Sequence, residues 1–255
     1  MKIVMLGSGN AATVLCELIV KNVHTIVQVV SRNEEHAKVL AASYNATTAS
    51  LTSSQFAEAD IYIIALNDTV LDHIETIRAL KGKFVVHIAG PVSINVLKEC
   101  SDTYGVLYPL QSLSKSTDHT PEIPFLVDGN TPEVLHQVSG FAKTLSSQVI
   151  EANDSERLNY HVSAIFVNNF TNHLYAIAEK FCEQERIDFK NLLPLIEETT
   201  QRLWSHSAFL TQTGPAMRND AFTLNRHLEA LSIYPEMKYL YLKLTESIMK
   251  MYGIK

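Results

Sequence analysis

The N-terminal stretch Lys2-Ile3-Val4-Met5-Leu6-Gly7-Ser8-Gly9-Asn10-Ala11-Ala12 decides the fold of this chain. An apolar run typical of a buried strand passes directly into a glycine turn, and a helical pattern follows the turn. The spacing of the small residues is the G-x-G-x-x-A form of the dinucleotide fingerprint. Because the strand and the helix that the fingerprint requires are both present, we interpret the stretch as nucleotide-binding rather than as a mere tight turn.

The small residues of this turn have separate physical roles. Gly7 allows the tight turn out of the strand, and Gly9, which has no side chain, lets a pyrophosphate approach the backbone. Ala12 lets the helix pack closely on the sheet. The first N–H groups of the helix have no intrahelical partner and lie at its positive end, so we expect them to face the phosphates. The predicted cofactor contacts of this turn are Gly7, Ser8, Gly9, Asn10 and Ala11.

Composition narrows the class of protein and its partners. The 255 residues are 46% hydrophobic and 19% charged, which is typical of a folded domain with a sizeable core. A net charge of -6 without a basic patch argues against a nucleic-acid partner, and no apolar run reaches the ~18 residues that a membrane span needs. Three distant cysteines and no visible signal peptide indicate reduced thiols and a cytoplasmic protein. The histidines lack metal-ligand spacing, so we expect no metal site.

The end of the second predicted strand bears on the identity of the coenzyme. The β-branched run Thr25–Val30 ends at Ser31 and Arg32, where an NAD site usually has Asp or Glu for the ribose 2′-OH. A carboxylate would repel a 2′-phosphate, whereas a guanidinium binds it with charge-assisted hydrogen bonds. We therefore predict NADP(H) rather than NAD(H), with Ser31 and Arg32 at the 2′-phosphate. The alternative is a helix cap followed by an ordinary surface arginine.

Further strands alternate with helical stretches, which predicts an α/β fold with a doubly wound, Rossmann-type parallel sheet. Two clear strands cover residues 60–66 and 83–89. A later strand at 123–127 contains Pro124, which favours an edge position, and the polar segment 116–122 before it is typical of a loop. Because ligands of such sheets lie at the carboxyl ends of strands, we add further cofactor contacts: Leu66, Asn67, Ala89, Gly90 and Pro91.

The character of the chain changes near residue 153. We predict a Rossmann-like NADP-binding domain over 1–153 and an all-α domain over 154–255, because the apolar spacing beyond 153 is mostly helical. The first helix of this second half is largely apolar yet carries His161, Asn168, Asn169 and Asn172. On an ideal α-helix Asn168 and Asn172 fall nearly in line with His161, and Asn169 lies about 80° round. Buried amides and imidazoles need partners, so this helix either packs through them or lines a pocket.

Segments spread over essentially the full length carry a resemblance to a known family. They are the G-S-G-N-A-A turn, Tyr108-Pro109-Leu110-Gln111-Ser112, Tyr160-His161 with Asn169-Phe170, and Thr213-Gly214-Pro215 with Arg218, Asp220 and His227-Leu228. With them the chain resembles Rossmann-like NADP oxidoreductases that have a C-terminal helical domain of unknown function. That family is related to pyrroline-5-carboxylate reductase and to deazaflavin-dependent NADP reductases. The resemblance implies NADP as the cofactor and, as in the related reductases, a homodimer formed through the helical domain.

Two departures limit what the resemblance implies about chemistry. Tyr108 stands where the family commonly has His, so an acid–base role at that position is not carried over. The broader β-hydroxyacid dehydrogenase superfamily uses a Lys four residues before an Asn on the interdomain helix. Here Ala164 and Ile165 precede Asn168 and Asn169 by four residues, so the lysine chemistry is not carried over either.

These observations predict an NADP(H)-dependent oxidoreductase that transfers a hydride to or from a small-molecule C=O or C=N substrate. Such a transfer needs a proton donor, and we assign His161 to it because imidazole titrates near neutrality; Asn169 would orient the substrate. A core or capping role for His161 is the alternative. Arg218 and Asp220 either form an ion pair between helices or face the cleft. A different function class, an NADP-binding sensor without turnover, also fits the sequence.

Overall fold

The computed structural model of the chain describes residues 1–71, 73–115 and 121–254. The chain divides into two compact units, Met1–Asn169 and Phe170–Lys255. The boundary predicted near residue 153 coincides with the start of helix α5 (Asp154–Ala164), which lies within the first unit. Most of the segment expected as a loop, 116–122, lies outside the described residues.

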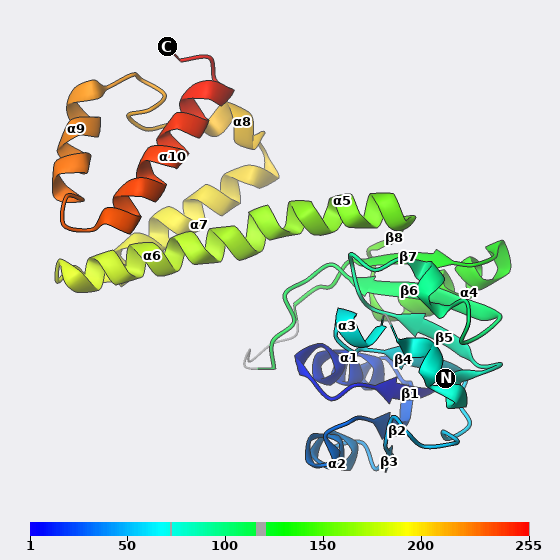
Figure 1. The fold of residues 1–255 in the computed structure, drawn as a ribbon. Coiled ribbons are helices and arrows are strands. Elements are labelled where there is room, and N and C mark those ends of the chain that lie inside the picture. Colours follow the sequence, from blue (N-terminus) through cyan, green and yellow to red (C-terminus); the bar gives the residue numbers. More distant parts are fainter. Residues whose placement is uncertain (72, 116–120, 255) are drawn as a thin grey trace. The chain divides into compact units, whose positions relative to one another are not determined.

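The first unit is organised around one sheet, which has eight strands in the described part of the chain (Figure 1). The strand order is β3-β2-β1-β4-β5-β6-β7-β8, and every neighbouring pair is parallel except β6 with β7. The strand order reverses at β1, so the carboxyl ends of β1, β2, β4 and β5 share one edge, where such folds bind ligands. The strands are β1 (Lys2–Leu6), β2 (Thr25–Val30), β3 (Thr47–Ala49), β4 (Ile61–Ile64), β5 (Phe84–His87), β6 (Thr103–Pro109), β7 (Phe125–Gly129) and β8 (Val149–Glu151).

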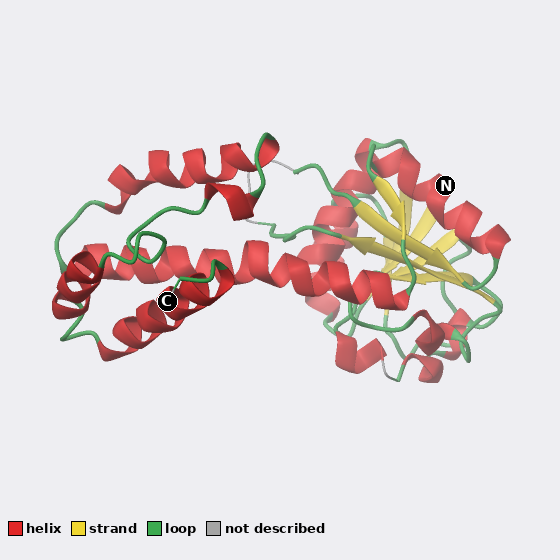
Figure 2. Ribbon diagram, turned by 90° about the horizontal axis from the view of Figure 1, so that it is seen from above, coloured by secondary structure: helices red, strands yellow, loops and turns green. Residues whose placement is uncertain are grey.

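Helices cover both faces of this sheet (Figure 2). Successive strand residues point to opposite faces, and β1 divides accordingly: Ile3 and Met5 join one buried cluster, and Val4 and Leu6 join the other. The first cluster includes residues of α1, α2 and α4, and the second includes residues of α3 and the short 3₁₀ turns. The predicted doubly wound α/β fold is thereby confirmed. The helical segments are α1 (Asn10–Lys21), α2 (Glu34–Ala42), α3 (Asp68–Leu71), η1 (Ile74–Thr76), η2 (Arg78–Leu80), η3 (Ile94–Leu97) and α4 (Pro132–Leu145).

Two local predictions for this unit are wrong. The strand predicted at 123–127 begins two residues later, at Phe125, and β7 lies between β6 and β8 rather than at an edge. Pro124 stays outside the ladder, where its missing N–H costs nothing, and its carbonyl accepts from the Leu110 N–H (2.8 Å). The apolar spacing of Val70, Leu71, Ile74, Ile77 and Leu80 predicts one helix, but the structure divides this segment into α3, η1 and η2. The side chains of Ile74 and Leu80 are nevertheless fully buried, because residues three positions apart also lie on the same face of a 3₁₀ turn.

The helix that carries His161 is not a regular α-helix throughout. After α5 the hydrogen bonding changes to a π-helix, η4 (Ile165–Phe170), before α6 (Thr171–Gln184) begins. The expected alignment of Asn168 and Asn172 with His161 assumed 3.6 residues per turn and does not hold past Ile165. Single π segments inside α-helices occur often at functional sites.

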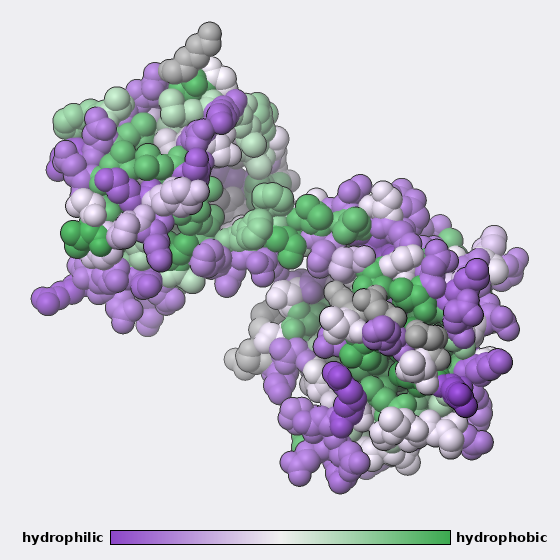
Figure 3. Space-filling view, viewed as in Figure 1, coloured by the Kyte–Doolittle hydropathy of each residue, from purple (hydrophilic) through white to green (hydrophobic). Residues whose placement is uncertain are grey.

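The second unit is helical and exposes much of its apolar surface (Figure 3). Of its described hydrophobic side chains only Cys182 and Ala216 are buried, whereas Trp204 is 92% exposed and Leu210 is 79% exposed. The second unit therefore has only a small apolar core of its own in the described part of the chain. Besides α6, its helical segments are η5 (Phe189–Leu192), α7 (Leu193–Gln201), η6 (Arg202–Trp204), α8 (Ala208–Thr211), α9 (Ala221–Ala230) and α10 (Pro235–Met251).

Candidate functional site

The glycine turn after β1 has a backbone that only glycine adopts without strain. Gly7 has φ of 129°, and a Cβ at this position would lie 2.2 Å from the Ala65 carbonyl oxygen. The Gly7 N–H donates to the Val30 carbonyl (2.8 Å), so the turn is fixed between β1 and β2. This turn brings the start of α1 to the ligand-binding edge of the sheet.

The N-terminus of α1 is free to receive an anion. Gly9 precedes the helix, no side chain caps it, and the first turn contains no acidic residue. A Cβ at Gly9 would meet nothing within 4 Å, so the space beside its backbone is open to a ligand. These features fit the pyrophosphate of a dinucleotide, which would accept hydrogen bonds from the helix N–H groups.

A cleft of about 670 Å³ opens at this turn. Within it the Ser8 and Ser31 hydroxyls are 2.9 Å apart, and Ser31 Oγ accepts from the Asn33 N–H (3.2 Å). The cleft brings together seven predicted cofactor residues, and its three other lining residues, Asn33, Glu34 and Ala65, were not predicted. Asn10 and Ala11 lie at the first positions of α1 and do not line it. The seven are Gly7, Ser8, Gly9, Ser31, Arg32, Leu66 and Asn67.

A second cavity, of about 450 Å³, lies between the segment that follows β6 and the α5–η4 helix. His161 and Asn169, the two predicted catalytic residues, both line it, and so does Asn168. Tyr108, at the end of β6, also lines it, and its hydroxyl is 3.0 Å from His161 Nδ1. Burial raises the pKa of Tyr108, so the phenol stays neutral. In the sequence Tyr108 stands out only as a departure from a family pattern, and its bond to His161 was not predicted.

Gly90, at the carboxyl end of β5, touches the Tyr108–His161 pair. A Cβ on Gly90 would lie 2.8 Å from Tyr108 Cζ and 2.9 Å from His161 Nδ1. Of the predicted cofactor residues Ala89, Gly90 and Pro91, none lines the cleft at the glycine turn. The contacts of Gly90 are instead with the pair that lines the second cavity.

His87, the last residue of β5, is fully buried beneath this loop. Burial, and after it the charge of Arg157, lower its pKa to about 3, although Asp154 and the Ser93 backbone partly offset them. The neutral ring accepts a hydrogen bond from the Ala89 N–H at Nδ1 (3.2 Å). His87 therefore supports the backbone that leads to Gly90 and does not act as a charged group near pH 7.

The polar residues singled out in the second unit have structural partners. Asp220 caps α9 by accepting from the Thr223 N–H (3.0 Å) and hydroxyl (2.7 Å), and these bonds lower the pKa of Asp220. Arg218 lies 4.0 Å from the same carboxylate. In the described part of the chain no group of side chains has the composition of a metal site, and no helix is long and apolar enough to cross a membrane.

A cleft beside an uncapped helix N-terminus, in the same unit as a cavity lined by a hydrogen-bonded His–Tyr pair, is an arrangement typical of dinucleotide-dependent oxidoreductases. Residues 2–91 match the family described as NADP oxidoreductase coenzyme F420-dependent, and residues 123–248 match the Domain of unknown function (DUF2520). The chain is 34% identical to a Bacteroides fragilis protein whose name classes it as an NADP oxidoreductase, with 98% of each chain covered and a TM-score of 0.87. The chain belongs to this NADP oxidoreductase family and uses a nicotinamide cofactor.

More distant structures share the fold. A 1-pyrroline-5-carboxylate reductase from Streptococcus pyogenes is 14% identical, with 98% of each chain covered and a TM-score of 0.56. A reductive aminase from Aspergillus terreus, whose structure contains NADPH and ethyl-5-oxohexanoate, is 15% identical, with 100% of this chain and 88% of that chain covered and a TM-score of 0.61. Among proteins with curated functions, none matches this chain.

Proposed function

We propose that this protein is a reductase that moves a hydride between NADP(H) and the carbon of a small-molecule C=N or C=O group. The observation that carries the proposal is the Tyr108–His161 hydrogen bond at the wall of the second cavity, in contact with Gly90. A reduced substrate nitrogen or oxygen needs a proton, and a positioned imidazole is the commonest donor. The names of the two distant reductases, one for a cyclic imine and one for reductive amination, favour C=N.

The coenzyme fits the cleft by charge and shape. The open backbone at Gly9 and the first N–H groups of α1 would bind the pyrophosphate, and Ser31 with Arg32 would bind the 2′-phosphate. Glu34 lines the same cleft and opposes a second negative charge there, so Arg32 is needed to offset it. Bound in this way, the coenzyme would direct its nicotinamide toward Gly90 and Pro91.

His161 is the proposed proton donor. Its Nδ1 is occupied by Tyr108, so Nε2 is the nitrogen that remains for a substrate. When the ring is an imidazolium, its Nδ1–H donates to the neutral Tyr108 oxygen. After Nε2 has given its proton to the substrate nitrogen or oxygen, the Tyr108 hydroxyl turns and donates to Nδ1. The coenzyme supplies the electron pair as a hydride from its nicotinamide ring, so protons and electrons balance.

Asn169 is the proposed substrate-orienting residue. Its amide offers both a donor and an acceptor to an uncharged polar group in the cavity. Asn168 lines the same cavity, so two successive amides of the π-helical segment lie at its wall. This arrangement supports recognition of a small polar substrate close to His161.

The test is stopped-flow oxidation of NADPH against a panel of imines and ketones, with His161→Ala, His161→Gln and the wild type. We expect turnover to fall by roughly 10²- to 10⁴-fold in both variants while NADPH binding is retained. His136→Ala is the matched control, because His136 is exposed on α4 of the same unit. Full turnover of His161→Ala on a substrate that the wild type reduces would remove His161 from the mechanism.

The exposed apolar surface of the second unit supports the proposed homodimer. A second copy of the chain would cover side chains such as Trp204, Leu210 and Phe222, which are each more than 70% exposed. Light scattering after size-exclusion chromatography measures the mass directly. Because Trp204 is the single tryptophan, its emission also reports whether it is covered. A monomeric mass with the emission of a fully hydrated indole contradicts the homodimer.

A further inference from the structure

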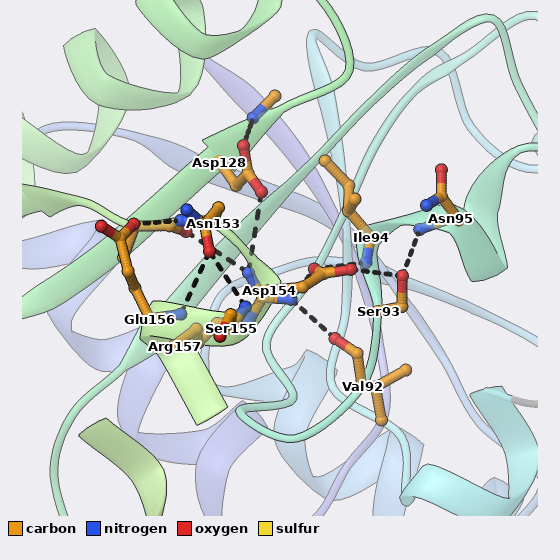
Figure 4. Close-up of polar contacts among 12 residues, drawn as sticks. Val92, Ser93, Ile94, Asn95, Asp128, Asn153, Asp154, Ser155, Glu156 and Arg157 are labelled. Atoms are coloured by element: carbon orange, nitrogen blue, oxygen red, sulfur yellow. Dashed lines mark hydrogen bonds and ion pairs between the residues drawn. The ribbon is translucent and has the colours of Figure 1, made fainter. Parts of the chain in front are cut away.

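Arg157 is a buried charge in a helix whose other residues are at least partly exposed. It is 1% exposed and is the one buried residue of α5, all of which is described. Its guanidinium donates to three backbone carbonyls: Nε to Gly90 (3.1 Å), Nη2 to Val92 (2.7 Å) and Nη1 to Ala152 (3.5 Å). Figure 4 shows the Arg157 side chain, which comes from α5, bonded to the Val92 carbonyl in the loop that follows β5. A buried charge is retained only where such partners satisfy it.

Two carboxylates complete the surroundings of Arg157. Asp154, one turn earlier on α5, is 2.5 Å from Nη2, and it also accepts from Ser93 Oγ (2.5 Å) and the Ile94 N–H (3.0 Å). Burial of Asp154 is outweighed by these hydrogen bonds, so its pKa is lowered. Asp128 lies 3.8 Å away, and its burial raises its pKa. Asp154 is thus the principal counter-ion, and it binds the same loop from the other side.

The partners of Arg157 lie in the loop that touches the reactive pair. Arg157 holds the carbonyls of Gly90 and Val92, and Gly90 contacts His161 one helical turn further along α5. The loop is therefore fixed to α5 at one turn and meets the imidazole at the next. Arg157 lines neither cavity, and each of its three nitrogens already has a partner, so it is no proton donor to a substrate.

We propose that Arg157 is a positioning residue: it ties the Gly90–Val92 loop to α5 and so fixes the distance between the nicotinamide site and His161. This proposal rests on the proposed function, in which the nicotinamide lies at Gly90. A planar fork suits several carbonyls and a carboxylate at once, whereas a lysine ammonium is a point charge on a flexible stem. Lysine at this position keeps the charge and loses the fork.

The experiment compares Arg157→Lys with the wild type and with Arg202→Lys, an exposed arginine that also bonds a carboxylate, that of Glu198 four residues earlier. Reacting groups misplaced by about 1 Å lose roughly 10²-fold in rate, so we expect kcat of Arg157→Lys to fall by about 30- to 100-fold. The dissociation constant of NADPH should change by less than about threefold, because the pyrophosphate and 2′-phosphate contacts are untouched. Arg202→Lys should match the wild type.

A second readout does not depend on turnover. Amide hydrogen exchange of the segment 89–94 should become at least about tenfold faster in Arg157→Lys, while exchange at β1 and α1 is unchanged. Ser93→Ala removes the Ser93–Asp154 bond, leaves Arg157 in place and should give a smaller change of the same kind, which serves if Arg157→Lys does not fold. Unchanged exchange and unchanged kcat in a folded Arg157→Lys would overturn the proposal. If the wild type itself never oxidises NADPH, the proposed function fails, and the exchange result still decides whether Arg157 holds the loop.

Discussion

The two cavities of the first unit are built from different parts of the chain. The tight turn from Gly7 to Gly9 after β1 forms one side of the cleft of about 670 Å³ with its backbone. The second cavity depends on side chains that are far apart in sequence: Tyr108 and His161 are separated by 53 positions. The cleft can therefore be retained while the side chains of the other cavity change, so one coenzyme can serve different substrates within one fold.

This difference in construction predicts how substitutions in each cavity affect the protein. A cleft made of strained backbone should fail together with the fold when its turn is altered. A cavity made of side chains should lose chemistry while the fold and coenzyme binding survive. The loop at Gly90 is bonded to Arg157 and, through Ala89, to His87. Substitutions there are expected to affect both the fold and the chemistry.

The largest effect is expected at Gly7, where the turn and the fold cannot be separated. Gly7→Ala puts a Cβ 2.2 Å from the Ala65 carbonyl oxygen at φ of 129°, and we expect unfolding to become easier by about 4 kcal/mol. Gly9→Ala is the control, because its Cβ meets nothing, so it should fold normally and only weaken NADPH binding. Urea unfolding measures the free energy of unfolding of both variants. Equal stability of the two variants would contradict a backbone-built cleft.

His87 should make the stability of the loop region depend on pH. In the unfolded chain its imidazole takes up a proton below about 6.5, whereas in the folded protein it stays neutral down to about 3. Between pH 6.5 and pH 3 the unfolded state thus binds more protons than the folded state. The contribution of His87 to the free energy of unfolding is therefore complete above pH 6.5 and is lost as the pH falls toward 3. Between pH 7 and pH 4 the loss attributable to His87 is about 3 kcal/mol.

The variant His87→Asn isolates this contribution. Its amide oxygen can still accept from the Ala89 N–H, but it does not titrate. Denaturant unfolding at several pH values should give a shallower loss for His87→Asn than for the wild type. Parallel curves for the two proteins would show that His87 is protonated as easily in the folded state as in the unfolded chain.

Tyr108→Phe tests the side-chain cavity alone. It removes the hydroxyl beside His161 Nδ1 and leaves the ring, and a hydrogen bond to a charged imidazole is worth about 2 kcal/mol. We expect turnover to fall about thirtyfold, with the pH profile of kcat displaced and the affinity for NADPH retained. Tyr104→Phe, elsewhere on β6, serves as the control. A loss of NADPH affinity equal to the loss of turnover would mean that the two cavities are not independent.

The same difference explains what the sequence could predict. The turn at Gly7 and the strand ends are local patterns with one physical solution, so seven of the predicted cofactor residues do line one cleft, and their binding of a coenzyme stays a prediction. The position of β7 was wrong because the edge rule was applied to a proline that lies just outside the strand. The Tyr108–His161 bond needed the tertiary structure, since nothing local relates positions 53 residues apart. Arg157 was also missed. The sequence places an arginine one helical turn before His161, but only the structure shows that this arginine is buried.

The smallest expected effect is at the 2′-phosphate, where the cleft uses side chains instead of backbone. Arg32 is exposed, so its charge is screened, and Arg32→Ala should weaken NADPH binding by about five- to tenfold and leave NADH binding nearly unchanged. Glu34 lines the same cleft, and Glu34→Gln should tighten NADPH by about twofold. Fluorescence titration of both coenzymes at two salt concentrations measures these effects, which should shrink at high salt. Equal losses for NADPH and NADH in Arg32→Ala would show that Arg32 contacts a part common to both coenzymes, and the prediction of NADP specificity from Ser31 and Arg32 would then be wrong.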